Sequence, residues 1–168
     1  ENSVVLMNFQ KAFDDAEHST LNFEEVAQTY YDVHDDDIDF LAVFHTVYNQ
    51  RQQENEIARY IPVSNSINGV GRHIFNRANQ FGSMGRLKGV LDMGNISQYA
   101  GDVGKGPNLT LGTLVHEIMH SVSGSLMILD DSNATSDILM GKDDPFHWSR
   151  FLLETSFLGG DGWAAEGG

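Results

Sequence analysis

The stretch that decides the fold, residues 111–124, reads LGTLVHEIMHSVSG. Apolar residues recur in it at helical spacing, at positions 111, 115, 118 and 122, and this pattern predicts an amphipathic helix. Asn108 or Thr110 could cap this helix, which is expected to run to about Val122, because Gly124 is a typical residue just past a helix end. It should bury the apolar stripe in the core and turn His116 and His120 towards a cleft.

His116 and His120 are four residues apart, so a helix places both imidazoles on one face, one turn apart. Both can then reach one zinc ion at about 2.0–2.1 Å. Glu117 lies beside that face, where it can act as a general base on a water molecule without binding the metal. Because the chain has no cysteine, any transition-metal site must be built from His, Asp and Glu.

Residues 116–120, HEIMH, resemble the HExxH motif of the zincin metallopeptidases. The resemblance implies a small mixed sheet with an active-site helix, a Zn²⁺ cofactor, a water molecule activated by Glu117, and hydrolysis of a peptide bond. It covers the motif strictly and the strand order only loosely. The metzincin extension HExxHxxGxxH is absent, because Ser123 and Leu126 occupy the required positions, so the chain does not fit that subclass.

A catalytic zinc ion usually has three protein ligands and a water molecule. His147, in the sequence PFHW at 145–148, is the favoured third ligand, because it follows His120 at a distance that lets a loop return to the metal. A later His-Trp pair followed by a Gly-Gly segment, here residues 159–160, is also similar to some bacterial zincin-like proteins. His116, His120 and His147 are therefore the expected metal ligands.

Glu154 is the alternative third ligand, and it would make the site resemble that of a gluzincin. The NExxSD-type context of such enzymes is missing, which makes Glu154 the weaker candidate. Asp130 and Asp131 are weaker still, because they stand in a turn rich in helix-breaking residues. The choice between His147 and Glu154 stays open at the level of sequence.

The order of expected elements predicts an α+β fold with a small mixed sheet backed by helices, and the resemblance implies that this fold is a zincin-like domain. The expected elements, in chain order, are a buried strand at 3–9, a helix at 14–31 that Asn22 could cap, a central strand at 39–48, a third strand at 87–93 and the HExxH helix. Gly89 indicates a bulge or an edge position in the third strand. Residues 50–60 are expected at the surface, residues 62–86 in a long loop, and the tail after Gly124 should be irregular.

Residues 1–168 are expected to form one catalytic domain. The net charge of −14 opposes binding to nucleic acid and to anionic membranes, and no apolar run is long enough for membrane insertion. The expected partner is a peptide or protein substrate, and the oligomeric state is open. An acidic, cysteine-free chain that begins without Met is expected to be a processed bacterial protein, secreted or at the cell surface. Its Gly-Gly end allows a longer secreted parent protein.

Other residues could take part in binding. The acidic segment 35–37 with Asp39 could hold a structural Ca²⁺ ion, although a solvated turn is favoured because no glycine stands where an EF-hand loop needs one. His73 could stabilise an oxyanion and Tyr99 could reach the cleft, but a surface position and a packing role are favoured for them. His45 alternates with apolar residues and is expected to be structural.

Three functions are compatible with the motif. The favoured one is a zinc peptidase that holds its substrate extended along an edge strand, with residues 87–93 as the candidate edge. The second is a zinc hydrolase of a non-protein amide or ester. The third is a non-catalytic binding or adhesion module with a vestigial metal site. The intact Glu117 argues against the third, because a purely structural metal site has no need of a base.

Overall fold

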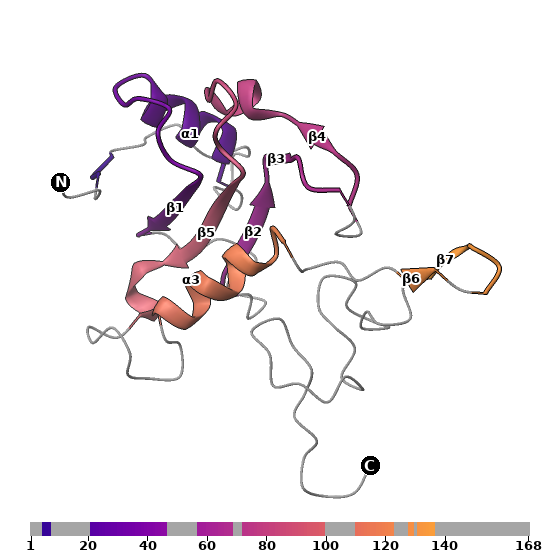
Figure 1. Ribbon diagram of the computed structural model, residues 1–168. Coiled ribbons are helices and arrows are strands. Elements are labelled where there is room, and N and C mark those ends of the chain that lie inside the picture. Colours follow the sequence, from indigo (N-terminus) through magenta and orange to yellow (C-terminus); the bar gives the residue numbers. More distant parts are fainter. Residues whose placement is uncertain are drawn as a thin grey trace, which may run out of the picture.

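The computed structural model describes residues 5–7, 21–46, 57–68, 72–99, 110–122, 128–129 and 131–136. These residues form a mixed α/β structure, compatible with the expected α+β class (Figure 1). Its elements are α1 (Phe23–Tyr31), β1 (Phe40–His45), β2 (Arg59–Pro62), β3 (Ser64–Asn65), β4 (Phe75–Asn76), the 3₁₀ helix η1 (Ala78–Phe81), β5 (Gly89–Asn95), the 3₁₀ helix η2 (Ile96–Gln98), α3 (Thr110–Met119), β6 (Ile128–Leu129) and β7 (Thr135–Ser136). No helix in the described ranges has the length and apolar content needed to cross a membrane.

The main sheet has the strand order β1-β5-β2. β1 runs parallel to β5, whereas β2 runs antiparallel to it, so the sheet is mixed. All seven residues of β5 are buried, as expected for a strand that has neighbours on both sides. The prediction that residues 87–93 form the edge strand is therefore wrong, and β1, expected to be central, lies at one edge of the described sheet.

Gly89 marks neither a bulge nor an edge. It lies at the start of β5, and a Cβ atom added to it would lie 2.2 Å from Cε2 of Tyr60. Gly89 is therefore needed because an aromatic ring from β2 covers it. The irregularity in the sheet occurs between Val43 and His45, where the register between β1 and β5 shifts.

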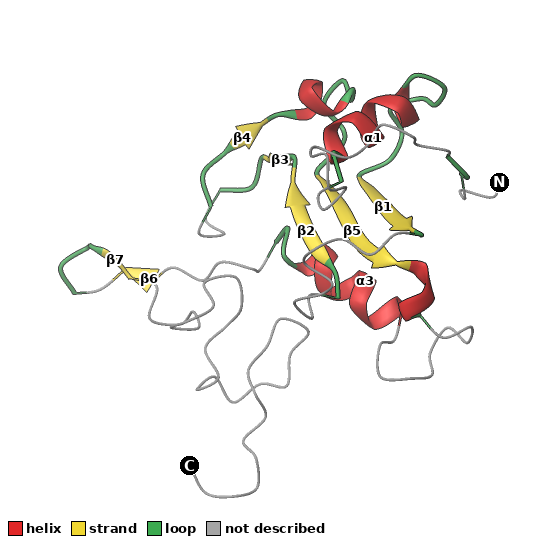
Figure 2. Cartoon of the chain, turned by 180° about the vertical axis from the view of Figure 1, so that it is seen from behind, coloured by secondary structure: helices red, strands yellow, loops and turns green. Residues whose placement is uncertain are grey.

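Helix α1 closes the apolar core beside the start of β5 (Figures 1 and 2). The side chain of Asn22 accepts a hydrogen bond from the amide of Glu25 at 3.0 Å, which confirms the expected cap. Phe23, Val26 and Ala27 of α1 are buried. They form one cluster with these residues: Leu21, Val63, Ala78, Phe81, Leu87 and Val90.

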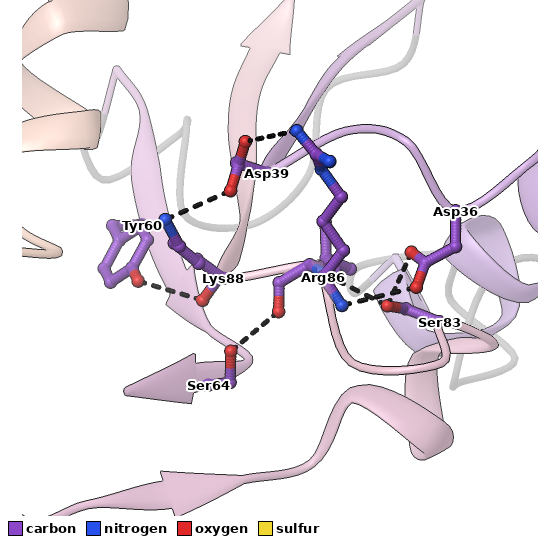
Figure 3. Close-up of polar contacts among 8 residues, drawn as sticks. Asp36, Asp39, Tyr60, Ser64, Ser83, Arg86 and Lys88 are labelled. Atoms are coloured by element: carbon purple, nitrogen blue, oxygen red, sulfur yellow. Dashed lines mark hydrogen bonds and ion pairs between the residues drawn. The ribbon is translucent and has the colours of Figure 1, made fainter. Parts of the chain in front are cut away.

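The acidic segment after α1 binds protein donors. Asp36 accepts hydrogen bonds from the hydroxyl of Ser83 at 2.7 Å and from the amides of Met84 and Arg86 at 2.9 and 3.3 Å (Figure 3). Asp39 forms ion pairs with Arg86 at 3.3 Å and Lys88 at 3.0 Å. Asp36 and Asp39, two of the carboxylates considered for calcium, thus hold the loop before β5. In the described ranges, no group of possible metal ligands includes residues of the acidic segment.

Three further expectations differ from the structure. Residues 5–7 lie in no strand, and Leu6 is fully exposed, so the buried strand expected at 3–9 is wrong for these residues. The segment at 50–60, expected to be only surface, ends in β2. The expected loop at 62–86 contains β3, β4 and η1, whose hydrogen bonds join residues far apart in the sequence.

Candidate metal site

The expected HExxH helix is present as α3, which contacts β5 and β2 near the carboxyl end of β5 (Figures 1 and 2). Its orientation is not the one that the apolar stripe predicts. Leu111 is 58% exposed and Val122 is 42% exposed, whereas Glu117 is the one residue of α3 that is buried. His120, just after the helix, is buried too. The helix therefore turns part of its polar face inward, towards the sheet.

The two histidines have their ring nitrogens close together. The Nε2 atoms of His116 and His120 lie 3.3 Å apart, and the rings meet edge to face, with their centroids at 4.9 Å and an angle of 82° between their planes. Two nitrogens that share a tetrahedral zinc ion at about 2.0–2.1 Å each must lie about 3.3–3.4 Å apart. The separation of the Nε2 atoms therefore fits two ligands of one metal ion.

Glu117 completes a group of three possible ligands. One carboxylate oxygen of Glu117 and one nitrogen of each histidine all lie within 4.8 Å of one another. Among the described residues this is the one group of its kind. A carboxylate at such a distance can either bind the metal or contact it through one water molecule. The three residues thus form a candidate metal site, and their donor set does not by itself choose the metal.

Tyr60 is a residue of the site that the sequence analysis missed. Its ring lies nearly parallel to the imidazole of His120, with 6.4 Å between centroids and 16° between planes. Its hydroxyl donates to the carbonyl oxygen of Lys88 at 3.1 Å, and burial raises its pKa to about 12. Only the pairing of β2 with β5, which places Tyr60 diagonally across from Gly89, identifies it as a neighbour of the site.

Tyr99 and His45 have the structural roles that were favoured for them. The hydroxyl of Tyr99 donates to the carbonyl oxygen of Met93 at 2.7 Å. Burial raises the pKa of Tyr99 to about 12, with smaller contributions from the charges of Glu117 and Asp92. His45 lies 3.3 Å from Asp92, and both side chains are largely buried, so this pair joins β1 to β5.

The remaining candidates are not brought to the site by the described residues. His73 is exposed, and its backbone carbonyl accepts a hydrogen bond from Asn65. Asp131 is exposed as well and belongs to no group of possible ligands. His147, Glu154 and Asp130 lie outside the described residues, so the third ligand stays a prediction.

Comparisons with protein-family models, with curated protein sequences and with solved structures found no match to this chain. Function is therefore inferred from the chemistry of the site alone. That chemistry is two converging imidazoles and a buried carboxylate on one helix, which could hold a metal ion.

Proposed function

We propose that the chain is a zinc-dependent peptidase in which His116 and His120 hold the metal and Glu117 is the general base. The observation that carries the proposal is the 3.3 Å separation of the two Nε2 atoms, which suits a shared tetrahedral ion, beside a buried carboxylate. A purely structural site would need only ligands. The Glu117 carboxylate, buried beside the two imidazoles, is in a position to act as a base on a water molecule at the metal.

Each residue of the site has a separate role in the proposed hydrolysis. A bound zinc ion would supply Lewis acidity, polarising the scissile carbonyl group and a water molecule. Glu117, which is 5% exposed, accepts a proton from the attacking water molecule and delivers it to the leaving amine. His147 is proposed as the third ligand, on the sequence argument given above.

The substrate is proposed to lie along β2. Among the described strands β2 is at an edge of the sheet, and α3 contacts it. An extended peptide can add to such an edge through main-chain hydrogen bonds. This replaces the central strand β5 as the candidate substrate edge, and it places the peptide backbone beside the ring of Tyr60 and the imidazole of His120.

The test is an activity assay on the zinc-loaded chain with an unstructured protein and with small ester and amide substrates. Cleavage of the protein, abolished by a chelator and restored by zinc, is the expected result. If esters or non-peptide amides are hydrolysed and peptide bonds are not, the chain is a hydrolase of another class. If nothing is hydrolysed although zinc is bound, the site is a binding site and the peptidase proposal fails.

A further inference from the structure

His120 lies beyond the helix that positions its partner. α3 ends at Met119, and His120 begins a turn in which the amides of Ser121 and Val122 donate to the carbonyls of Ile118 and Met119. His116 lies inside the helix, whose backbone fixes the direction of its Cα–Cβ bond, while the χ1 and χ2 torsions set the imidazole of either histidine. The orientation of the His120 imidazole therefore depends on the side chains that pack against it.

The ring of Tyr60 lies nearly parallel to the His120 imidazole and displaced to one side of it, with 6.4 Å between centroids and 16° between planes. The edge-to-face contact with His116, at 82°, determines only how the two ligands meet. A flat aromatic neighbour restricts rotation of the imidazole about its χ2 torsion, which is otherwise broad. The ring of Tyr60 can therefore fix the direction in which Nε2 of His120 points.

Tyr60 is itself fixed at both ends. Its backbone pairs with Leu91 across the β2–β5 ladder, and its hydroxyl donates to Lys88 at 3.1 Å (Figure 3). Between these points the ring fills the space that Gly89 leaves, because a Cβ at Gly89 would lie 2.2, 2.9 and 3.0 Å from three atoms of the ring. A ring held in this way cannot tilt freely. The pairing of β2 with β5 therefore sets the position of the Tyr60 ring relative to His120.

We propose that Tyr60 is a positioning residue of the metal site: its ring, seated over Gly89, holds the His120 imidazole in the orientation in which its Nε2 faces that of His116. The inference rests on the proposed metal function and adds to it a residue outside the HExxH motif. Partners that orient metal ligands typically change metal affinity by about 10–100-fold when they are removed.

The test compares Tyr60→Leu, Tyr60→Phe and Gly89→Ala by zinc affinity in competition with a chelator and by the absorption spectrum of the Co²⁺-substituted protein. Tyr60→Leu should lose about tenfold in affinity and change the spectrum. Tyr60→Phe keeps the ring over Gly89 and loses only the hydrogen bond to Lys88, so its loss of affinity should be clearly smaller than that of Tyr60→Leu. Gly89→Ala displaces the ring and should resemble Tyr60→Leu.

Tyr99→Leu is the matched control, because Tyr99 also donates its hydroxyl to a β5 carbonyl, and no ring contact joins it to His116 or His120 in the described part of the chain. It should keep wild-type affinity and spectrum. Equal losses in Tyr99→Leu and Tyr60→Leu would mean a general packing defect, and wild-type behaviour of Tyr60→Leu would overturn the proposal. Equal losses in Tyr60→Phe and Tyr60→Leu would assign the effect to the hydroxyl and overturn it too.

A metal-free readout separates this inference from the proposed function. The imidazole signals of His120 in the NMR spectrum of the apo chain should move in Tyr60→Leu, whereas those of His34, which stacks on Tyr30, should stay unchanged. If the wild-type chain binds no metal, the metal proposal fails while the His120 signals still test the contact. Unchanged His120 signals would overturn the positioning role whatever the wild-type chain binds.

Discussion

Helices α1 and α3 have nearly the same length, 9 and 10 residues, but they bury opposite kinds of side chain. α1 buries Phe23, Val26 and Ala27 against the apolar core. α3 buries Glu117 and leaves Leu111 largely exposed. Apolar burial stabilises a fold, whereas burial of a carboxylate costs free energy unless partners compensate. The comparison indicates that α1 mainly stabilises the apolar core, whereas α3 mainly carries the possible metal ligands.

The two regions also use their acids differently. The carboxylate of Asp36 accepts hydrogen bonds from Ser83, Met84 and Arg86. These bonds compensate its charge and hold the loop before β5 in place. Glu117 lies beside two imidazoles whose Nε2 atoms face each other, an arrangement suited to a metal ion. Buried charges near such a group are typical of functional sites.

Truncation in the core of α1 should have the largest effect on stability. Phe23→Ala removes a buried ring and is expected to lower the free energy of unfolding by about 3–5 kcal/mol. Urea unfolding monitored by circular dichroism measures the loss. Leu111→Ala on α3 is the matched control and should change stability by less than about 1 kcal/mol, because Leu111 is mostly exposed. A large loss in Leu111→Ala would contradict the division between the helices.

Removal of the carboxylate of α3 should affect activity and not stability. Glu117→Gln is expected to keep the fold and the bound zinc while lowering kcat by about 100-fold or more, because the general base is lost. Steady-state kinetics on a peptide substrate, together with metal analysis of the same sample, give the measurement. Near-normal turnover in Glu117→Gln would remove Glu117 from the mechanism.

The third ligand can be identified by affinity. His147→Ala should weaken zinc binding sharply, by about tenfold or more, because a two-histidine site lacks a donor that tight binding requires. Glu154→Gln should leave the affinity nearly unchanged. Chelator competition on both variants decides between them, and the reverse result would replace His147 with Glu154 and favour the gluzincin resemblance.

The smallest expected effect concerns acid stability. Burial alone would raise the pKa of Asp36, but hydrogen bonds from the Ser83 hydroxyl and from the amides of Arg86 and Met84 outweigh it and lower that pKa. A lowered folded-state pKa means that the stabilisation is present above the unfolded value of about 3.9 and is lost as the pH falls through the folded value.

Asp36→Asn should therefore cost about 1–3 kcal/mol at pH 7 and reduce the loss of stability below about pH 4. Urea unfolding at pH 7 and pH 3 provides the test, with the exposed neighbour in Asp35→Asn as control. Equal acid sensitivity in Asp36→Asn and the wild-type chain would show that the Asp36 contacts do not contribute.

The two helices could be predicted from the sequence, because local sequence patterns determine where they form. The Asn22 cap, the apolar spacing of α1 and the HExxH spacing of α3 each lie within one turn or two of helix. The edge strand was misplaced because Gly89 was interpreted as an edge signal, whereas the ring of Tyr60 covers it in the central strand β5. Tyr60 was missed because its relation to Gly89 exists only once β2 and β5 are paired, and such long-range pairing leaves no local pattern.

The central claim is that His116 and His120 hold one metal ion, and stoichiometric metal binding tests it most directly. The purified apo chain is titrated with zinc by calorimetry, and the loaded protein is analysed for its metal content. The account predicts one zinc ion per chain, lost when His116→Ala and His120→Ala are combined and retained in Glu117→Gln. A double variant that retains its zinc in full, or a folded wild-type chain that binds none, would contradict it.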